Sequence, residues 1–282
     1  MQKVKIVTQS GCDLTFDLAA KHGIMMLPDF VIFGSTTYRN NLDIHAEDFY
    51  NLLESSPVNP SSAHPSPSDF IDAFESCGGY DDIICILMSE KTTGTINTVT
   101  MVTEMLKTGG FKPNIHIYDS KHVSYGLAIA ALEAADLAAQ GAGAEEIIEH
   151  LDNLVDKIKV CFTMKSLEYA KRGGRIGAIE ARTADKLGLK PLLTFVDGNV
   201  TDIDVSNSFE KNVRSIEAKF NEEYCGGHRV VIFHADNLER AEKIREHILA
   251  SHKDAEVYIQ WVGPVVGIYT GRGCVGIAYV SK

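Results

Sequence analysis

The sequence predicts an α/β protein of two domains: an N-terminal, mostly parallel sheet with helices on both faces, and a C-terminal mixed α/β domain. Three observations support this prediction. In the first half, short apolar runs alternate with helix-like segments, which is typical of strand–helix–strand units. In the second half, Asp197-Gly198 separates two strand-like runs, and this dipeptide favours a tight antiparallel hairpin. The 282 residues suffice for one large or two ordinary domains.

The first half contains four apolar runs and five helix-like segments. The candidate strands are Val4–Val7, Ile24–Leu27, Ile83–Met88 and Ile115–Tyr118. The candidate helices are Phe16–His22, Ala46–Glu54, Ser68–Ser76, Ile96–Lys107 and Ala128–Ala139. Residues at the helix ends support these assignments. Thr15 can cap the first helix and Gly23 can end it, while Ser66, Pro67 and Asp69 form an N-cap, a first-turn proline and an acidic first turn.

The second half alternates less regularly. Its candidate strands are Val160–Met164, Pro191–Val196, Asn199–Val205, Arg229–His234, Glu256–Trp261 and Val275–Val280, and its candidate helices are Ser208–Glu223 and Leu238–Ser251. A helical segment at Ala144–Lys157 bridges the halves, so we expect domains at residues 1–158 and 159–282. The hairpin makes at least one strand pair antiparallel.

Composition excludes several classes of function. The net charge is -11 and no basic run interrupts it, which disfavours nucleic acids and anionic membranes as partners. The longest apolar-leaning stretch, Leu127 to Ala139, contains two acidic residues and is too short for membrane insertion. Six cysteines are scattered singly, without zinc-ligand spacing, so we expect reduced thiols and no metal or cofactor. The N-terminus lacks a signal-peptide pattern, and we expect a cytoplasmic protein.

A polar stretch follows the third candidate strand. Thr93, Gly94 and Thr95 stand where the next helix begins, and unpaired amides together with the helix dipole favour an anion there. A phosphate or a carboxylate satisfies such a site equally well. The simpler interpretation is that Thr93 or Thr95 caps the helix. No nucleophile is paired with a base in the sequence, which favours a binding protein over an autonomous enzyme.

Further polar clusters stand in an order that carries a resemblance. Over essentially its whole length, the chain resembles the DegV family of bacterial fatty-acid-binding proteins. The matching segments are Thr8-Gln9-Ser10, Ser62-Ala63-His64-Pro65-Ser66, Thr93-Gly94-Thr95, Tyr118-Asp119-Ser120, Leu167-Glu168-Tyr169 with Gly173-Gly174-Arg175-Ile176, Lys190-Pro191-Leu192-Leu193, and Tyr269-Thr270-Gly271-Arg272-Gly273.

The resemblance implies one long-chain fatty acid in a tunnel between the domains, with its carboxylate held by hydroxyls and backbone amides. The residues implied near the carboxylate, with Ser62 and Thr93 as its main donors, are Ser62, His64, Thr93, Gly94, Thr95, Arg175, Tyr269 and Thr270. From the apolar pattern we expect the tunnel to be lined by Phe30, Ile32, Phe162, Met164, Leu193 and Ile268. Burying the acyl chain is worth roughly 0.8 kcal/mol per methylene.

The resemblance also implies a partner, because related proteins present the fatty acid to a separate fatty acid kinase. The sequence departs from the family pattern in five places: Gln9 replaces an aspartate, Ala63 replaces a serine, Asp204 to Ser208 lack a Lys-x-Arg pattern, Tyr269 replaces a histidine, and Arg272 replaces a proline. The alternative hypothesis is a small-molecule kinase or transferase subunit that binds a phosphorylated ligand at the same loop. A lipid binder requires a long dry tunnel behind the anion site, whereas a phosphosugar or nucleotide site requires more polar groups.

Overall fold

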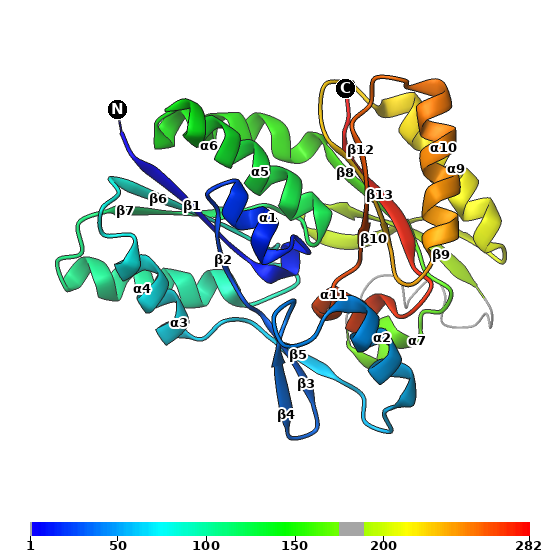
Figure 1. Cartoon of the computed structure of the whole chain (residues 1–282), viewed down its shortest axis with the longest axis horizontal. Helices are drawn as coiled ribbons and strands as arrows, with labels where there is room; N and C mark the ends of the chain where they lie inside the picture. Colours follow the sequence, from blue (N-terminus) through cyan, green and yellow to red (C-terminus); the bar gives the residue numbers. More distant parts are fainter. Residues whose placement is uncertain (1, 175–188) are drawn as a thin grey trace.

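The computed structural model describes residues 2–174 and 189–282, and its two halves lie side by side (Figure 1). The N-terminal half is built on a four-stranded parallel sheet in the order β2-β1-β6-β7. The strands are β1 (Val4–Gln9), β2 (Met25–Leu27), β6 (Asp82–Leu87) and β7 (Asn114–Asp119). All four predicted strands are therefore confirmed to within two residues.

Helices cover both faces of this sheet, as predicted. Alternate side chains of β6 point to opposite faces: Ile83 and Leu87 pack with α3 and α4, while Ile84 and Ile86 pack with α5 and α6. The helices are α1 (Phe16–Lys21), α3 (Pro67–Ser76), α4 (Thr95–Thr108), α5 (Tyr125–Gln140) and α6 (Ala144–Leu154). Because both faces are covered, β6 is buried along its whole length and carries a continuous apolar run.

The predicted helix ends are confirmed. The Thr15 hydroxyl accepts a hydrogen bond from the Leu18 amide at 3.2 Å. Ser66 and Asp69 form a reciprocal capping box, and Gly23 has a positive φ of 70°. These local signals fix where the helices begin and end before any tertiary contact is considered.

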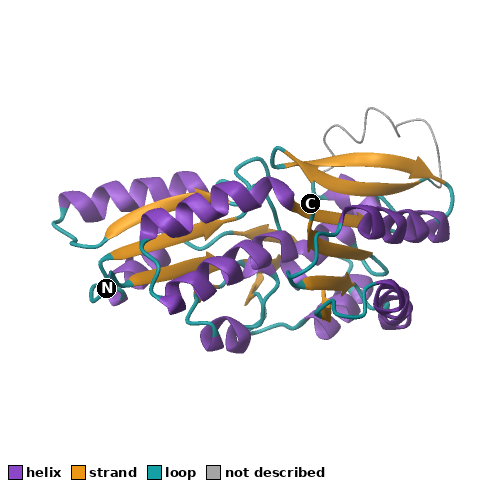
Figure 2. Cartoon of the chain, turned by 90° about the horizontal axis from the view of Figure 1, so that it is seen from above, coloured by secondary structure: helices purple, strands orange, loops and turns teal. Residues whose placement is uncertain are grey.

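The C-terminal half is built on a six-stranded mixed sheet in the order β10-β9-β8-β13-β11-β12. The strands are β8 (Ile158–Thr163), β9 (Lys190–Val196), β10 (Asn199–Ser206), β11 (Val230–His234), β12 (Val257–Trp261) and β13 (Val275–Val280). Only the β11–β12 pair is parallel. Helices α9 (Phe209–Glu223) and α10 (Leu238–Ser251) pack on one face. Figure 2 shows helices on both sides of the strands.

The predicted hairpin joins β9 to β10. Asp197 has a φ of 47° and Gly198 a φ of 79°, and two consecutive positive values are the signature of a type I′ turn. The predicted antiparallel pair is therefore confirmed.

A third sheet and two short helices were not predicted. Strands β3 (Phe30–Phe33), β4 (Thr36–Arg39) and β5 (Ser61–Ala63) form a small antiparallel sheet in the order β4-β3-β5. With α2 (Ala46–Ser55), this sheet lies next to α11 (Pro264–Thr270) and α7 (Glu168–Arg172) of the C-terminal half (Figure 1). These elements, β3, β4 and β5 with α2, form an arm of the N-terminal half that packs against the C-terminal half. No helix of the described residues is both long and apolar enough to cross a bilayer.

Buried polar contacts join the two halves. The Tyr50 hydroxyl donates to the Val262 carbonyl at 3.1 Å, and the Tyr125 hydroxyl donates to the Trp261 carbonyl at 2.7 Å. Beside them, the buried Asp13 carboxylate accepts a hydrogen bond from the Ser124 hydroxyl at 2.6 Å. Gly263 faces this carboxylate so closely that an added Cβ would overlap it. Burial raises the pKa of Asp13 to about 8 despite the Ser124 hydrogen bond.

We predict that Asp13→Asn removes a pH dependence of stability. The native state holds the Asp13 proton up to about pH 8, whereas an unfolded chain releases it near the usual aspartate pKa of 3.8. The unfolding free energy therefore falls as pH rises from about 4 to 8, by at most about 1.4 kcal/mol per pH unit. Urea unfolding at several pH values should show this fall in the wild type, and Asp13→Asn should lose it between about pH 6.5 and 8; below that range Asp29 and His122, whose pKa values are also shifted by burial, contribute in both proteins. The exposed Asp72→Asn variant should follow the wild type, and parallel curves for Asp13→Asn and the wild type would contradict the assignment.

Candidate functional site

A cavity of about 210 Å³ lies between the two halves. The segments that follow β2, β6 and β7 reach it from the parallel sheet, and β8, β9 and β10 form the opposite wall. This position is the carboxyl edge of the parallel sheet, where open α/β folds bind their ligands. Apolar side chains dominate the lining, so most of the cavity offers no hydrogen-bonding group to a ligand.

The polar end of the cavity is the start of α4. Thr92, Thr93 and Gly94 line it, and Gly94 is the N-cap residue. No side chain caps this helix, because its N-cap residue is a glycine, and the hydroxyls of the flanking Thr93 and Thr95 hydrogen bond to each other at 2.9 Å. The interpretation that one of these threonines caps the helix is therefore wrong. The first-turn amides and the positive end of the helix dipole are left to face the cavity.

Ser62 reaches the same end from β5. Its hydroxyl lies 2.7 Å from the hydroxyl of Tyr269 on α11, so this contact joins the N-terminal arm to the C-terminal half. The Tyr269 ring packs on Gly173 so closely that an added Cβ there would overlap it. Thr270, the next residue on α11, also lines the cavity and is buried.

His64 follows Ser62 at the end of β5 and is half-buried. Its Nδ1 lies 2.9 Å from the Pro65 carbonyl oxygen, which can only accept, so Nδ1 carries the hydrogen. Its Nε2 faces the start of α4, 3.9 Å from the position that a Cβ on Gly94 would occupy. His64 therefore stands beside the uncapped helix end.

Asp29 brings a carboxylate to the cavity lining and is 1% exposed. It accepts hydrogen bonds from the Gly11 amide at 2.7 Å and from the Gln9 side-chain amide at 2.8 Å, with the Ser10 hydroxyl at 3.3 Å. Burial raises the pKa of Asp29 to about 6, against these hydrogen bonds and the field of His64. Nothing in the sequence pattern singled out Asp29, because it is one acidic residue between two strands.

The apolar wall comes from the C-terminal sheet and α11. Phe162, Met164 and Leu193 line the cavity, as the sequence predicted. Further lining residues that sequence reasoning missed are Met88, Val123, Ala170, Phe195, Val200, Val265 and Val266. The period of a strand would have found Phe195, two residues after Leu193 on the same face of β9, and Val200 lies opposite it on β10.

Some predicted residues lie elsewhere. Thr95 is buried beneath Thr93, and Ile268 is buried outside the cavity lining. Phe30 and Ile32 also lie outside the lining, because β3 turns Val31 and Phe33 into the core and leaves the alternate residues half-buried. Arg175 lies outside the described residues.

The tip of the β9–β10 hairpin closes one side of the site. The Ser89 hydroxyl, buried after β6, donates to the Gly198 carbonyl at 2.8 Å. An added Cβ on Gly198 would overlap the Ser89 oxygen, and the φ of 79° disfavours any side chain. Gly198 is therefore required both by the turn and by the contact between the halves.

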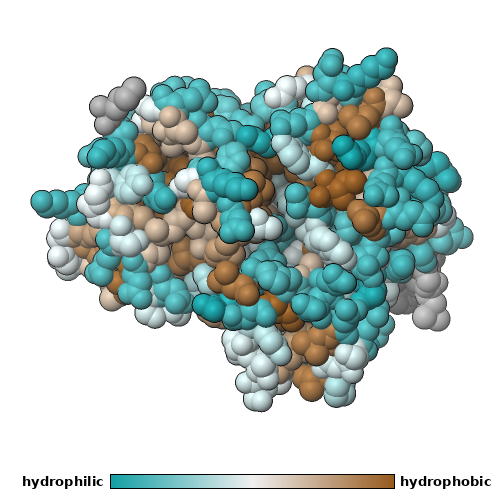
Figure 3. Space-filling model, in the orientation of Figure 1, coloured by the Kyte–Doolittle hydropathy of each residue, from teal (hydrophilic) through white to brown (hydrophobic). Residues whose placement is uncertain are grey.

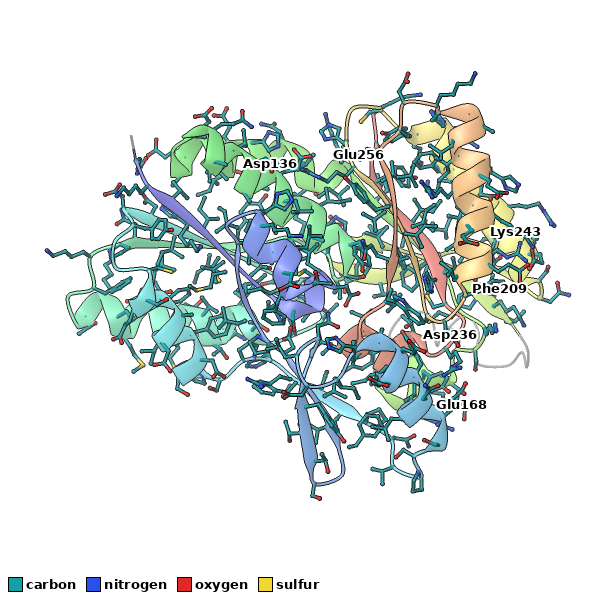
Figure 4. The ribbon with its side chains drawn as sticks, viewed as in Figure 1. Asp136, Glu168, Phe209, Asp236, Lys243 and Glu256 are labelled. Atoms are coloured by element: carbon teal, nitrogen blue, oxygen red, sulfur yellow. The ribbon has the colours of Figure 1, made fainter. Side chains whose placement is uncertain are left out.

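Arg272 lies two residues after Thr270, near the cavity, and links α2 of the N-terminal half to the C-terminal half. Its guanidinium donates to Asp236, labelled in Figure 4, at 2.7 Å and to Asn51 at 2.7 Å, and it lies 3.2 Å from Glu54. The arm of the N-terminal half is thus tied to the C-terminal half next to the cavity. On the face shown in Figure 3, polar residues dominate and apolar patches are small.

The described residues contain no cluster of three or more side chains that could hold a metal ion. Over the same residues, the cavity lining includes one carboxylate and one imidazole but neither lysine nor arginine. The arrangement can bind an amphiphilic molecule: amides and hydroxyls receive its polar group, and the apolar wall receives its chain.

The comparisons with known proteins all point to the same family. A family model described as an uncharacterised protein of the DegV family matches residues 3–282. A DegV domain-containing protein of Halalkalibacterium halodurans is 29% identical, with full coverage of both chains. Two solved structures are each 26% identical to this chain in sequence. One is described as DegV, a fatty acid binding protein from Bacillus subtilis. The other is described as showing fatty acid binding of a DegV family protein from Thermus thermophilus. Both superpose with a TM-score of 0.89 over the full length of both chains.

We predict that Gly198→Ala destabilises the protein more than Gly227→Ala does. Both glycines have a positive φ, 79° and 75°, but Gly227 has no atom within 4 Å of an added Cβ. The backbone strain of about 1 to 2 kcal/mol is common to both variants, and only Gly198→Ala also displaces Ser89. Chemical unfolding of the two variants measures the difference, and equal losses of stability would contradict a close contact between Ser89 and the hairpin.

Proposed function

This chain belongs to the DegV family, and from that premise we propose that it binds one long-chain fatty acid in the cavity between its two halves. The observation that carries the proposal is an apolar cavity that ends at an uncapped helix N-terminus. The Bacillus subtilis and Thermus thermophilus proteins described as binding fatty acids support it.

We place the carboxylate at the start of α4. The Thr93 and Ser62 hydroxyls and the amides of Gly94 and Thr95 are its donors, with His64, Tyr269 and Thr270 nearby. A carboxylate at this position satisfies first-turn amides that no side chain reaches. Ser62 can donate to a ligand because the Tyr269 hydroxyl, its present partner, can itself supply the hydrogen of their shared bond.

We place the acyl chain along the wall formed by Phe162, Met164, Leu193, Phe195 and Val200. Each methylene removed from water contributes roughly 0.8 kcal/mol, so the chain supplies most of the affinity and the polar end sets the orientation. The same wall disfavours the alternative of a phosphorylated sugar or nucleotide, whose hydroxyl and ring nitrogen atoms would lose hydrogen bonds there.

We further propose that the carboxyl end is accessible to a partner. Ala63 and Gly94 are exposed beside the polar end, which supports presentation of the fatty acid to a separate fatty acid kinase. We retain 1–158 and 159–282 as the two domains, because the strands of the six-stranded sheet run from Ile158 to Val280. We also propose that the protein works in the cytoplasm, with the fatty acid as its only ligand and no cofactor.

Ligand identity is tested first by mass spectrometry. Protein purified without lipid or detergent should release one fatty acid per chain on organic extraction, and native mass should show the same adduct. Across a series of saturated fatty acids, affinity should rise roughly fourfold per methylene until the wall is covered. A protein that carries no fatty acid and binds none of the series, but does bind a sugar phosphate, would support the alternative hypothesis.

The Ser62→Ala/Thr93→Ala double variant tests the carboxylate site. A hydrogen bond to a charged group is worth about 1.5 to 3 kcal/mol, so losing two should raise the Kd for palmitate by roughly a hundredfold or more. Ser55→Ala/Thr100→Ala is the matched control, since both hydroxyls are exposed and bond only to their own helices. Unchanged affinity in the first double variant would place the carboxylate elsewhere.

A further inference from the structure

The hydrogen-bonding state of His64 is fixed on one side of its ring. Because Nδ1 donates to the Pro65 carbonyl at 2.9 Å, the neutral ring has only a lone pair on Nε2. That lone pair faces the start of α4, beside the proposed position of the carboxylate. Two acceptors would then face each other, which is unfavourable because neither can donate a hydrogen to the other.

The charged groups around His64 make binding of an anion beside a neutral imidazole still less favourable. The titratable side chains that line the cavity are Asp29 from the β2–β3 connection, His64 from β5 and Tyr269 from α11. Among the described residues, no lysine or arginine joins them in the lining. A fatty acid anion would therefore share the cavity with the Asp29 carboxylate, and only the helix dipole and neutral donors would oppose the two negative charges.

We propose that His64 becomes the cation of this site: when a fatty acid anion binds, Nε2 takes up one proton from solvent and donates it as a hydrogen bond to the ligand carboxylate. The inference rests on the proposed fatty acid function and adds its proton linkage. The imidazolium then keeps both ring hydrogens bonded, one to Pro65 and one to the ligand, and lies between two carboxylates.

Two other groups compete for this proton. Asp29 already accepts hydrogen bonds from the Gly11 amide and the Gln9 amide, and both favour its ionised form. The fatty acid carboxyl would receive donors from the start of α4, which also favours ionisation. Among the described side chains of the lining, the Nε2 atom of His64 is the titratable ring nitrogen that faces the proposed carboxylate, so the proton goes there. Binding must then strengthen as pH falls through the neutral range, by up to about tenfold per pH unit.

Isothermal titration calorimetry tests the linkage directly. Myristate, kept below its aggregation concentration, is titrated into the full-length protein at about pH 7.5 in buffers with different protonation enthalpies. The dependence of the binding enthalpy on buffer should correspond to uptake of about one proton per ligand. His64→Gln keeps a donor but cannot take up a proton, so uptake should fall to near zero and the Kd should lose its pH dependence.

Matched controls separate the possible proton sites. His45→Gln changes an exposed histidine away from the cavity and should keep the uptake. Tetradecanol, which has no carboxylate, should bind without a proton. Asp29→Asn should keep most of the uptake, and loss of uptake in Asp29→Asn with retention in His64→Gln would overturn the assignment in favour of Asp29.

A spectroscopic measurement keeps the test independent of variant stability. In the myristate complex of the wild type, the ¹⁵N shifts of the His64 ring should show both nitrogens protonated. Myristate binding without proton uptake, or a neutral His64 ring in the complex, would overturn this inference and leave the proposed function standing. Failure of every fatty acid to bind would overturn the proposed function itself, and the inference with it.

Discussion

The uncapped start of α4 is the constraint on which the site depends. A helix leaves its first amides without partners, and at most helix ends a side-chain oxygen accepts from one of them. Here the N-cap residue is Gly94, which has no side chain, and the flanking hydroxyls of Thr93 and Thr95 bond to each other. The parallel sheet brings this end to its carboxyl edge, and the C-terminal half encloses it. An acceptor supplied by a ligand completes the local hydrogen bonding.

Glycines permit the close approach of the two halves that encloses the apolar wall of the cavity. Gly198 meets Ser89 and Gly263 meets Asp13 across the interface, each at a distance that leaves no room for a Cβ, and within the C-terminal half Gly173 meets the Tyr269 ring in the same way. Polar contacts then lock the interface through Tyr50 and Tyr125. In such a partly enclosed site a hydrogen bond is stronger than in water, and an unpaired polar atom is more costly. The same enclosure therefore serves affinity at the apolar wall and selectivity at the polar end.

The sequence predicts those parts of the fold whose signals are local. Buried parallel strands appear as apolar runs, and caps such as Ser66 mark helix ends, so both sheets and their helices could be read from it. The β3–β4–β5 arm could not, because its strands have three or four residues and β4 is largely exposed. For β3, Phe-Val-Ile-Phe contains no polar residue, so the sequence does not say which alternate residues face the core. In the structure Val31 and Phe33 face the core, and Phe30 and Ile32 lie outside the cavity lining.

The carboxylate in the cavity depends on tertiary structure in the same way. The resemblance draws attention to Gln9 as the place where an acidic residue is absent, yet Asp29, 20 positions away, brings a carboxylate to Gln9, Ser10 and Gly11. No local pattern links positions 9 and 29; only the parallel pairing of β1 with β2, which sets Gln9 opposite Leu27, joins them. Because Asp29 is negative when ionised, this corner cannot attract an anion by net charge. Selection of a carboxylate must therefore come from oriented groups: the α4 amides, the hydroxyls of Ser62 and Thr93, and an imidazole whose free nitrogen points at them.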